Sequence, residues 1–420
     1  MIKEKLYLPL LGFISTSAAT LLVTLRGISQ TNFGDAFDYL NAGLAIANGD
    51  PYPRTASLPF FRPPGYPALI ALLSIISEEQ IVALLKIANI TLHVGTTFLI
   101  YFICQKKFNS KSALFAAGFY SINPLSLHQV TGVSTETLTA FLFLTFAYLL
   151  SFPLSVSKNF LLGAVMLFLT SVRPEYFFVV MPIYLWIYVR RRASKKNLVS
   201  SSIVLALIFT SIGLWGASNQ QATGKFIPFT DAANYHLWMG SLDLIASNYP
   251  LTFGNGRDFD QIQWNLLVSE IETQKQSWGA KYEASPIGEK SEFWSKAFLA
   301  SVEDQGFISY LQLLLFKGVI FWRPFLNPSS YDLASVLLSL PLLTSMTLLF
   351  VFGLRYFFRR ENIRTLVQIY SFGLLVITAV HMLQLPDLRY RIPLFLPICA
   401  IMFGGLISTR LKCEKFLTRI

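Results

Sequence analysis

The feature that most constrains this chain is a set of long apolar runs that contain no Asp, Glu, Lys or Arg. These runs are Leu6–Leu25, Leu198–Ala217, Leu333–Phe352, Leu366–Leu385 and Ile392–Ile407. A helix needs about 20 such residues to cross the hydrocarbon layer of a membrane, whereas buried helices of soluble proteins give runs of about 10–14. We see no alternating strands of the outer-membrane barrel type. The runs therefore predict an all-α integral membrane protein.

The charged residues predict its orientation. They make up only 14% of the chain, against about 25% in soluble domains, and the net charge is +11. Lys and Arg concentrate on the cytoplasmic side of membrane proteins. Segments expected inside carry +16 (19 basic minus 3 acidic residues), and the remainder carries −5 (15 − 20). These segments are Lys3–Lys5, Lys106–Lys111, Lys158, Arg190–Lys196, Arg355–Arg364 and Arg410–Arg419. Both termini are therefore expected in the cytoplasm, and the charge calls for no nucleic-acid partner.

One topology with about ten spans satisfies every basic segment. Besides the five runs, the expected spans are Ile81–Cys104, one starting near Ser112, Thr135–Phe152, Phe160–Val172 and Tyr176–Val189. Residues 1–217 then form an N-terminal transmembrane module with seven spans and a first outer loop at 26–80. Residues 218–332 form an extracytoplasmic segment, with an interfacial helix at 310–325 because Lys317 and Arg323 interrupt its apolar run. Residues 333–420 supply the last spans. We expect the plasma (inner) membrane.

The first outer loop holds the most informative polar residues. Residues 34–53 predict a helix that begins near Gly34 and lies on the membrane surface, because Asp35, Tyr39, Ala42 and Ile46 recur at helical spacing. Its membrane side is expected to carry Leu40, Leu44 and Ala47. The sequence Asn48-Gly49-Asp50-Pro51 should end it. Asp35 and Asp38 fall in the first turn, where the helix dipole favours negative charge, so a simple capping role for Asp35 stays open.

Further motifs follow in a fixed order along the chain. After Asp35, Tyr39, Ala42 and Gly49 comes an arginine with two prolines, then an acid opening the fourth span and an arginine ending the fifth. An Arg-Tyr pair precedes the last span. These residues are Arg62, Pro63, Pro64, Glu136, Arg173, Arg389, Tyr390 and Pro397. Together they resemble the C-type (GT-C) membrane glycosyltransferases, the superfamily of the protein O-mannosyltransferases and lipid A aminoarabinose transferases.

The resemblance implies an inverting transfer of a sugar from a polyprenyl-phosphate donor to a lipid, glycan or protein acceptor at the outer face of the bilayer. Asp35 is the expected general base, with Asp38 and Glu136 as further catalytic carboxylates. The arginines expected to bind the donor's phosphate are Arg62, Arg173, Arg389 and Arg391. Tyr39, Tyr66, Tyr390 and His128 are expected to support them. The superfamily often has an acid directly after the first Asp; Ala36 stands there, so the sequence leaves open whether a divalent metal takes part.

Other interpretations of the same residues stay open. Each arginine could extend to the lipid headgroups, and two have a local partner, Glu175 for Arg173 and Asp387 for Arg389. If residues 389–391 are extended, Arg389 and Arg391 face the same anion. The chief alternative function is a secondary transporter or flippase, which usually shows internal repeats that we do not find. A ligase or polymerase would keep the chemistry but use a diphosphate-linked donor.

Overall fold

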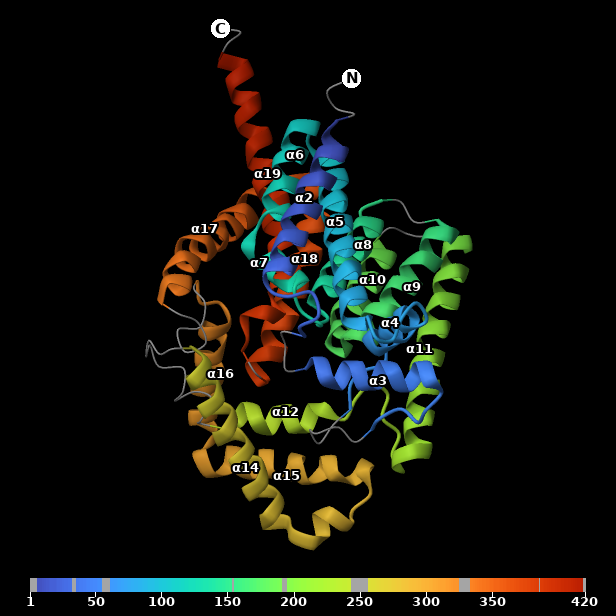
Figure 1. Cartoon of the computed structure of the whole chain (residues 1–420). Helices are drawn as coiled ribbons and strands as arrows, with labels where there is room; N and C mark the ends of the chain where they lie inside the picture. The colour runs from blue at the N-terminus through green and yellow to red at the C-terminus, as the bar shows by residue number, and fades with distance from the viewer. Residues whose placement is uncertain are drawn as a thin grey trace.

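The computed structural model describes residues 6–31, 35–54, 61–152, 155–190, 195–242, 256–324, 333–384 and 386–417. Helices make up 83% of the structure, and the described residues contain no strand. The all-α fold class is therefore confirmed. The helices form an upright bundle with several helices lying across its lower end (Figure 1).

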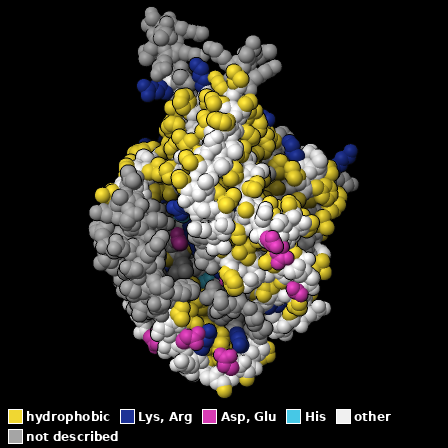
Figure 2. Space-filling model, viewed as in Figure 1, with side chains coloured by type: hydrophobic (Ala, Val, Ile, Leu, Met, Phe, Trp, Pro, Cys, Tyr) yellow, Lys and Arg dark blue, Asp and Glu magenta, His cyan; other side chains and the backbone are white. Residues whose placement is uncertain are grey.

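Six helices among the described residues are long and apolar enough to cross a membrane. They are α2 (Tyr7–Leu25), α5 (Ile81–Lys107), α11 (Lys195–Thr223), α17 (Leu333–Phe357), α18 (Glu361–Leu383) and α19 (Ile392–Leu417). Many large apolar side chains on α2, α11 and α17 are exposed, and hydrophobic atoms cover much of the upper part of the molecule (Figure 2). Contiguous exposed apolar surface is typical of lipid contact. The chain is thus a multi-pass membrane protein.

The predicted count of about ten spans is not supported by helix length. The four other expected spans are the shorter helices α6 (Ser110–Ser121), α8 (Glu136–Leu150), α9 (Val156–Val172) and α10 (Phe177–Arg190). A helix of 15 residues such as α8 rises only about 22 Å, less than the roughly 30 Å of hydrocarbon. Two of these helices end early for an evident reason. After α6, Asn123 and Pro124 start the separate helix α7 (Pro124–Val130). After α9, Pro174 starts the short 3₁₀ helix η1 (Pro174–Tyr176).

Helix α19 lies at the centre of the bundle. Residues 391–402 are all buried, and the helix packs against α6, α8 and α17. The first residues of α2 and the last of α19 lie at the upper end of the bundle (Figure 1). The 3₁₀ helix η2 (Leu388–Tyr390) immediately precedes α19. Because the first half of α19 is buried, η2 directly before it has a fixed position at the lower end.

The predicted surface helix of the first loop is present as α3 (Ala36–Asn48), which runs across the bundle (Figure 1). It ends as expected at Gly49, whose φ of 72° is left-handed and favours glycine. The three residues predicted for its membrane side are not part of its buried face, since Leu40 and Leu44 are half-buried and Ala47 is exposed, and their contact with the membrane stays a prediction. The buried face instead consists of Ala36, Tyr39, Ala42 and Gly43, packed on α4 (Gly65–Ser74).

Close packing of two helices explains which face of α3 is buried. A Cβ at Gly43 would collide with the side chain of Ile70 on α4, so the small residues of α3 mark the contact. The larger apolar residues are left at the margin. The periodicity of the sequence predicts that α3 is amphipathic, but the packing of α4 determines which of its residues are in close contact.

The segment after α11 forms a second, smaller core below the bundle. It contains α12 (Ala232–Ser241), α14 (Gly256–Ala284) and α15 (Ile287–Gln305). Aromatic rings fill its centre, with the Trp238 and Trp294 centroids 4.6 Å apart. The expected interfacial helix is α16 (Phe307–Phe321), and Lys317 within it is fully buried, where its Nζ donates to the Gly240 carbonyl at 2.8 Å.

Candidate active site

Four charged side chains from three separate segments meet at the lower end of the bundle, and we call them the Arg62 cluster. Arg62 Nη2 donates to Asp35 Oδ1 and to Asp38 Oδ2, both at 2.9 Å. Arg389 Nη2 donates to the other Asp35 oxygen, Oδ2, at 3.2 Å. Asp35 is 27 residues from Arg62 and 354 residues from Arg389 in the sequence. The structure thus unites Asp35, Asp38, Arg62 and Arg389, as the sequence predicted for one site.

The simple capping interpretation of Asp35 does not fit the geometry. Asp35 stands at the N-cap position of α3, but its side chain makes no capping hydrogen bond. The carboxylate points to the two arginines instead, and 33% of the side chain is exposed. A hollow lies near the junction of α3, α18 and α12, and basic, acidic and histidine atoms are visible there (Figures 1 and 2).

The position of Arg62 is set by its backbone. The Phe61 N–H donates to Asp231 Oδ1 at 3.1 Å, and Thr230 Oγ1 donates to the Phe61 carbonyl at 2.5 Å. The Tyr52 hydroxyl donates to the Arg62 carbonyl at 2.7 Å. Two prolines follow, and they restrict the backbone further. The guanidinium is therefore presented to α3 from a stiff loop.

A second group of side chains, which we call the Arg173 cluster, lies deeper in the bundle. Arg173 Nη2 donates to Glu136 Oε1 at 2.7 Å, and its Nε donates to Thr135 Oγ1 at 2.8 Å. Its Nη1 donates to Glu175 Oε1 at 3.2 Å. The side chain of Arg173 is only 10% exposed and that of Glu136 only 4%. The expected local pair with Glu175 exists, but the shorter contact is with Glu136.

Tyr390 joins the two clusters. Its ring centroid lies 5.0 Å from Arg173 Cζ and 4.8 Å from Arg389 Cζ, within range of cation–π attraction. Arg389 Nη2 also donates to the Tyr390 hydroxyl at 2.8 Å. The ring stacks on His381 with centroids 4.0 Å apart and planes 6° from parallel. His381 on α18 therefore supports the Tyr390 ring.

The remaining supporting residues lie at two places. Arg62 Cζ is 5.1 Å from the ring centroid of Tyr39, which in turn meets Tyr66 edge to face at 5.1 Å. Both tyrosines are buried, so they form the wall behind Arg62. His128 lies half-buried on α7, within electrostatic range of Glu136.

The prediction for Arg391 is not supported by its place in the structure. Its side chain is fully buried, and Nη1 and Nη2 donate to the carbonyls of Phe321 at 2.6 Å and Arg323 at 2.9 Å. The expectation that Arg389 and Arg391 face the same anion is wrong, because residues 388–390 form a 3₁₀ turn and are not extended. Arg391 instead caps the end of α16.

Opposing effects act on the Asp35 carboxyl. Burial favours the protonated form, but the positive charges of Arg389 and then Arg62 outweigh it and hold the pKa of Asp35 below its ordinary value. The group is therefore ionised at neutral pH. Burial raises the pKa of Tyr39 to about 12, so this phenol stays protonated.

Sequence reasoning missed two residues here. His236 on α12 lies close enough for Arg62, Asp35 and Arg389 to influence its titration; burial and then Arg62 lower the pKa of His236 to about 4, so the imidazole is neutral. Asp231 holds the Arg62 loop, and burial raises the pKa of Asp231 to about 6. Neither residue lies in a motif, and only the folding of the 218–309 segment against the first loop brings them here.

The described residues contain no group of three or more His, Cys, Asp or Glu side chains placed to hold a metal ion. Asp35 and Asp38 are the acidic pair of the Arg62 cluster, and guanidinium groups occupy three of their four oxygens. Such a donor set does not fit a divalent cation, which prefers several oxygen ligands. Cys104 and Cys399 are buried free thiols.

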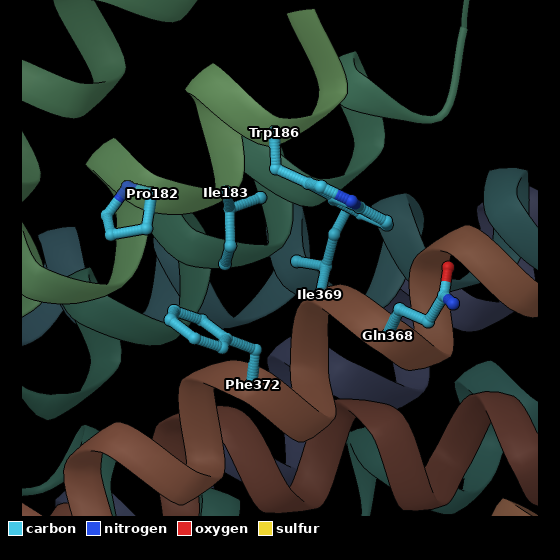
Figure 3. A pocket seen from close by; sticks show the side chains of 6 residues that line it. All are labelled: Pro182, Ile183, Trp186, Gln368, Ile369 and Phe372. Atoms are coloured by element: carbon cyan, nitrogen blue, oxygen red, sulfur yellow. The ribbon is translucent and has the colours of Figure 1, made fainter. Parts of the chain in front are cut away.

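A pocket between α10 and α18 has a different character (Figure 3). Its volume is about 370 Å³, and its lining contains no ionisable side chain. The lining residues are Pro182, Ile183, Trp186, Gln368, Ile369 and Phe372. It therefore suits apolar groups and not acid–base chemistry.

Comparison with known proteins agrees with this architecture. The family model for dolichyl-phosphate-mannose-protein mannosyltransferases matches residues 61–215, which include Arg62, Glu136 and Arg173 but not Asp35 or Arg389. No curated protein matches the chain by sequence.

Solved structures of an archaeal oligosaccharyltransferase share the fold. AglB from Archaeoglobus fulgidus, in complex with an inhibitory peptide and a dolichol-phosphate, has a TM-score of 0.54 at 12% identity, covering 99% of this chain and 52% of AglB. The apo form of the Archaeoglobus fulgidus oligosaccharyltransferase gives 0.55 at 14% identity, covering 98% of this chain and 52% of the other. The chain thus spans about half the length of these proteins. It is a polytopic membrane protein with the GT-C fold, and the predicted resemblance to the C-type membrane glycosyltransferases is confirmed.

Proposed function

We propose that the chain is a membrane glycosyltransferase that transfers a sugar from a polyprenyl-phosphate donor to a lipid, glycan or protein acceptor. The observation that carries this proposal is the partly exposed Asp35 carboxylate, held between two arginines from distant loops. A base beside fixed positive charge is what displacement of a phosphate from a sugar requires. The matching mannosyltransferase model, and the dolichol-phosphate in an AglB structure, support a lipid-linked donor.

Asp35 acts as the general base in this mechanism. The acceptor O–H gives its proton to the carboxylate while its oxygen forms a bond to the anomeric carbon of the sugar. The bond from that carbon to the phosphate oxygen breaks with its electron pair on the oxygen, so polyprenyl phosphate leaves. Displacement in one step inverts the anomeric configuration. Phosphate needs no general acid to leave, so one carboxylate suffices.

The arginines divide into two roles. Arg389 is 29% exposed and presents a guanidinium that matches phosphate oxygens, so we assign it to the donor's phosphate. Arg173 already has three partners within the bundle, and it positions Tyr390 beside Arg389. Asp38 accepts from both Nε and Nη2 of Arg62 and fixes its orientation.

We place this site at the extracytoplasmic face of the plasma (inner) membrane, with both termini in the cytoplasm. The three regions 1–217, 218–332 and 333–420 are part of this proposal. Cysteine labelling with an impermeant maleimide in intact cells tests it, in a background without native cysteines. Ala222→Cys, exposed near the end of α11, should react, and Ser157→Cys, exposed in the first turn of α9, should react only after lysis. The reverse pattern contradicts the proposed face.

The activity is tested with purified protein and a panel of polyprenyl-phosphate sugars, following release of polyprenyl phosphate. A second arm with diphosphate-linked sugars separates the ligase or polymerase type from the proposed one. Reconstituted vesicles that move a lipid-linked sugar across the bilayer without releasing polyprenyl phosphate would favour a flippase and contradict the proposal.

A further inference from the structure

Both oxygens of the proposed base are occupied by guanidinium groups in this structure. Oδ1 accepts from Arg62 at 2.9 Å and Oδ2 accepts from Arg389 at 3.2 Å. Each carboxylate oxygen can accept a second hydrogen bond, but two charge-assisted bonds stabilise the negative charge and make Asp35 a weaker base for the proton of an incoming hydroxyl. Release of one guanidinium would therefore strengthen Asp35 as the base.

The two arginines are not held equally. Arg62 is 11% exposed and donates through Nε and Nη2 to Asp38, at 3.2 and 2.9 Å, so its orientation does not depend on Asp35. Arg389 is 29% exposed and has other groups within reach: the Tyr390 hydroxyl at 2.8 Å and Asp387 Oδ2 at 3.5 Å. Arg389 is the contact that can leave Asp35 without creating an unpaired buried charge.

The group that would draw Arg389 away is the donor's phosphate. A phosphate offers oxygen pairs that match the guanidinium fork, and a charge-assisted bond to it replaces the one lost at Oδ2. We propose that donor binding transfers Arg389 from Asp35 to the donor's phosphate and so uncovers Asp35 Oδ2 for the acceptor hydroxyl. The donor then binds before the acceptor can be activated. This inference rests on the proposed function.

The groups that remain around Asp35 favour this exchange. On its own helix stand Asp38 and the protonated Tyr39; the loop before α4 supplies Arg62. Arg173 acts from the end of α9 and the neutral His236 lies on α12. After Arg389 leaves, Arg62 is the one direct cation on Asp35 among the residues that the structure describes. With half of the direct positive charge gone, the pKa of Asp35 rises toward its ordinary value, which strengthens it as a base.

Carboxyl labelling measures the exchange without any turnover. Carbodiimides react with protonated carboxyls, and labelling of each Asp can be read by mass spectrometry of the full chain in nanodiscs at mildly acidic pH. The probe is undecaprenyl phosphate, which leaves the sugar site empty for the reagent. Because one nearby cation lowers the pKa of an Asp by about 1–3 units, Asp35 labelling should rise about tenfold when the lipid binds. Asp38, still held by Arg62, is the internal control.

The Arg389→Gln variant should label at Asp35 at the high level with or without the lipid. Native mass spectrometry of the same samples establishes whether the lipid is bound. Saturable binding with unchanged or reduced Asp35 labelling would overturn the exchange but leave the proposed function standing. Absence of binding would contradict the donor class itself, and the inference with it.

Kinetics give a second test that needs no variant. At acidic pH, the fall of kcat/KM for the donor reports the pKa of the base in the free enzyme. The fall of kcat reports the pKa of the same base in the donor complex. The fall of kcat should occur at a pH about one unit higher than the fall of kcat/KM, because Asp35 in the donor complex has lost its contact with Arg389. Coincident falls in an enzyme that Asp35→Asn inactivates would overturn the exchange while keeping Asp35 as the base.

Discussion

The Arg62 cluster and the Arg173 cluster are built alike but stand in different surroundings. Each places one guanidinium between two carboxylates at 2.7–3.2 Å. In the Arg62 cluster the Asp35 side chain is 33% exposed, whereas the Glu136 side chain of the Arg173 cluster is 4% exposed. The difference is therefore one of access to water and ligand and not of chemistry.

Access decides what each cluster can do. A buried ion pair cannot lose one partner without leaving an unpaired charge in a medium of low dielectric, so the Arg173 cluster is fixed. A partly exposed pair can exchange partners with an incoming anion at small cost. The comparison assigns chemistry to the Arg62 cluster and support to the Arg173 cluster, and each prediction below tests that division.

The largest effect is expected for Asp35→Asn. Removing the base should lower the transfer rate about 10²–10⁴-fold, since general base catalysis is worth that much. The apparent Tm should change little, because Asp35 is partly exposed. Transfer assays and thermal unfolding in detergent measure both. A variant within about threefold of wild type would move the base elsewhere, and the same loss in Asp38→Asn alone would point to the neighbouring carboxylate.

Arg173→Leu should act on stability. It leaves Glu136 as an unpaired buried carboxylate, a defect that costs about 3–5 kcal/mol. Folded yield and apparent Tm should both fall. The matched control is Glu175→Gln, which keeps a hydrogen-bond acceptor at a site that is 21% exposed and should be far milder. Normal stability with lost activity in Arg173→Leu would place Arg173 in the chemistry instead.

Arg389→Lys and Arg391→Lys form a matched pair two residues apart. Lys cannot reproduce a forked grip on phosphate, so Arg389→Lys should lose at least about tenfold in kcat/KM for the donor, or roughly 1.4 kcal/mol. Arg391→Lys should lower the apparent Tm, because Arg391 donates to two backbone carbonyls in the buried interior. Its folded fraction should keep kcat/KM. Equal effects of the two substitutions on kcat/KM would contradict the assignment of phosphate binding to Arg389 and of a structural role to Arg391.

The smallest effect concerns Asp231 and has a defined pH dependence. Its pKa is raised from 3.8 to about 6, so the folded state holds its proton more tightly than the unfolded state. Stability should therefore fall as the pH rises from about 4 to 6. Asp231→Asn retains an acceptor for the Phe61 N–H but does not titrate, so its stability should not fall in this way. The Tm of Asp231→Asn minus the Tm of wild type should therefore increase as the pH rises from about 4 to 6.

Asp231→Ala is the contrasting variant. It removes the acceptor for the Phe61 N–H, loosens the loop that carries Arg62, and should reduce kcat/KM while Asp231→Asn does not. Thermal unfolding between pH 4 and 7, together with donor kinetics, distinguishes the two. A Tm difference between wild type and Asp231→Asn that is constant with pH would contradict the assigned titration.

The sequence by itself determined the all-α membrane fold, the amphipathic α3 with its end at Gly49, and the charged residues to which we assign the proposed chemistry. Apolar runs and the spacing of caps and glycines act locally, so a single chain displays them directly. The sequence also supplied Arg389, because an Arg-Tyr pair between prolines is visible without a structure. It overestimated the number of long spans, since hydropathy does not show where a helix breaks.

Only the tertiary structure decided which charges are neighbours. Arg389 and Asp35 are 354 residues apart, and nothing local says that η2 and the start of α3 meet. The 3₁₀ turn at residues 388–390 separated Arg389 from Arg391, and the folding of α12 under the bundle brought His236 to the site. Burial, which makes one arginine cluster a support and leaves the other able to bind, is a property of the whole packed chain, because it depends on every helix that excludes water from a side chain.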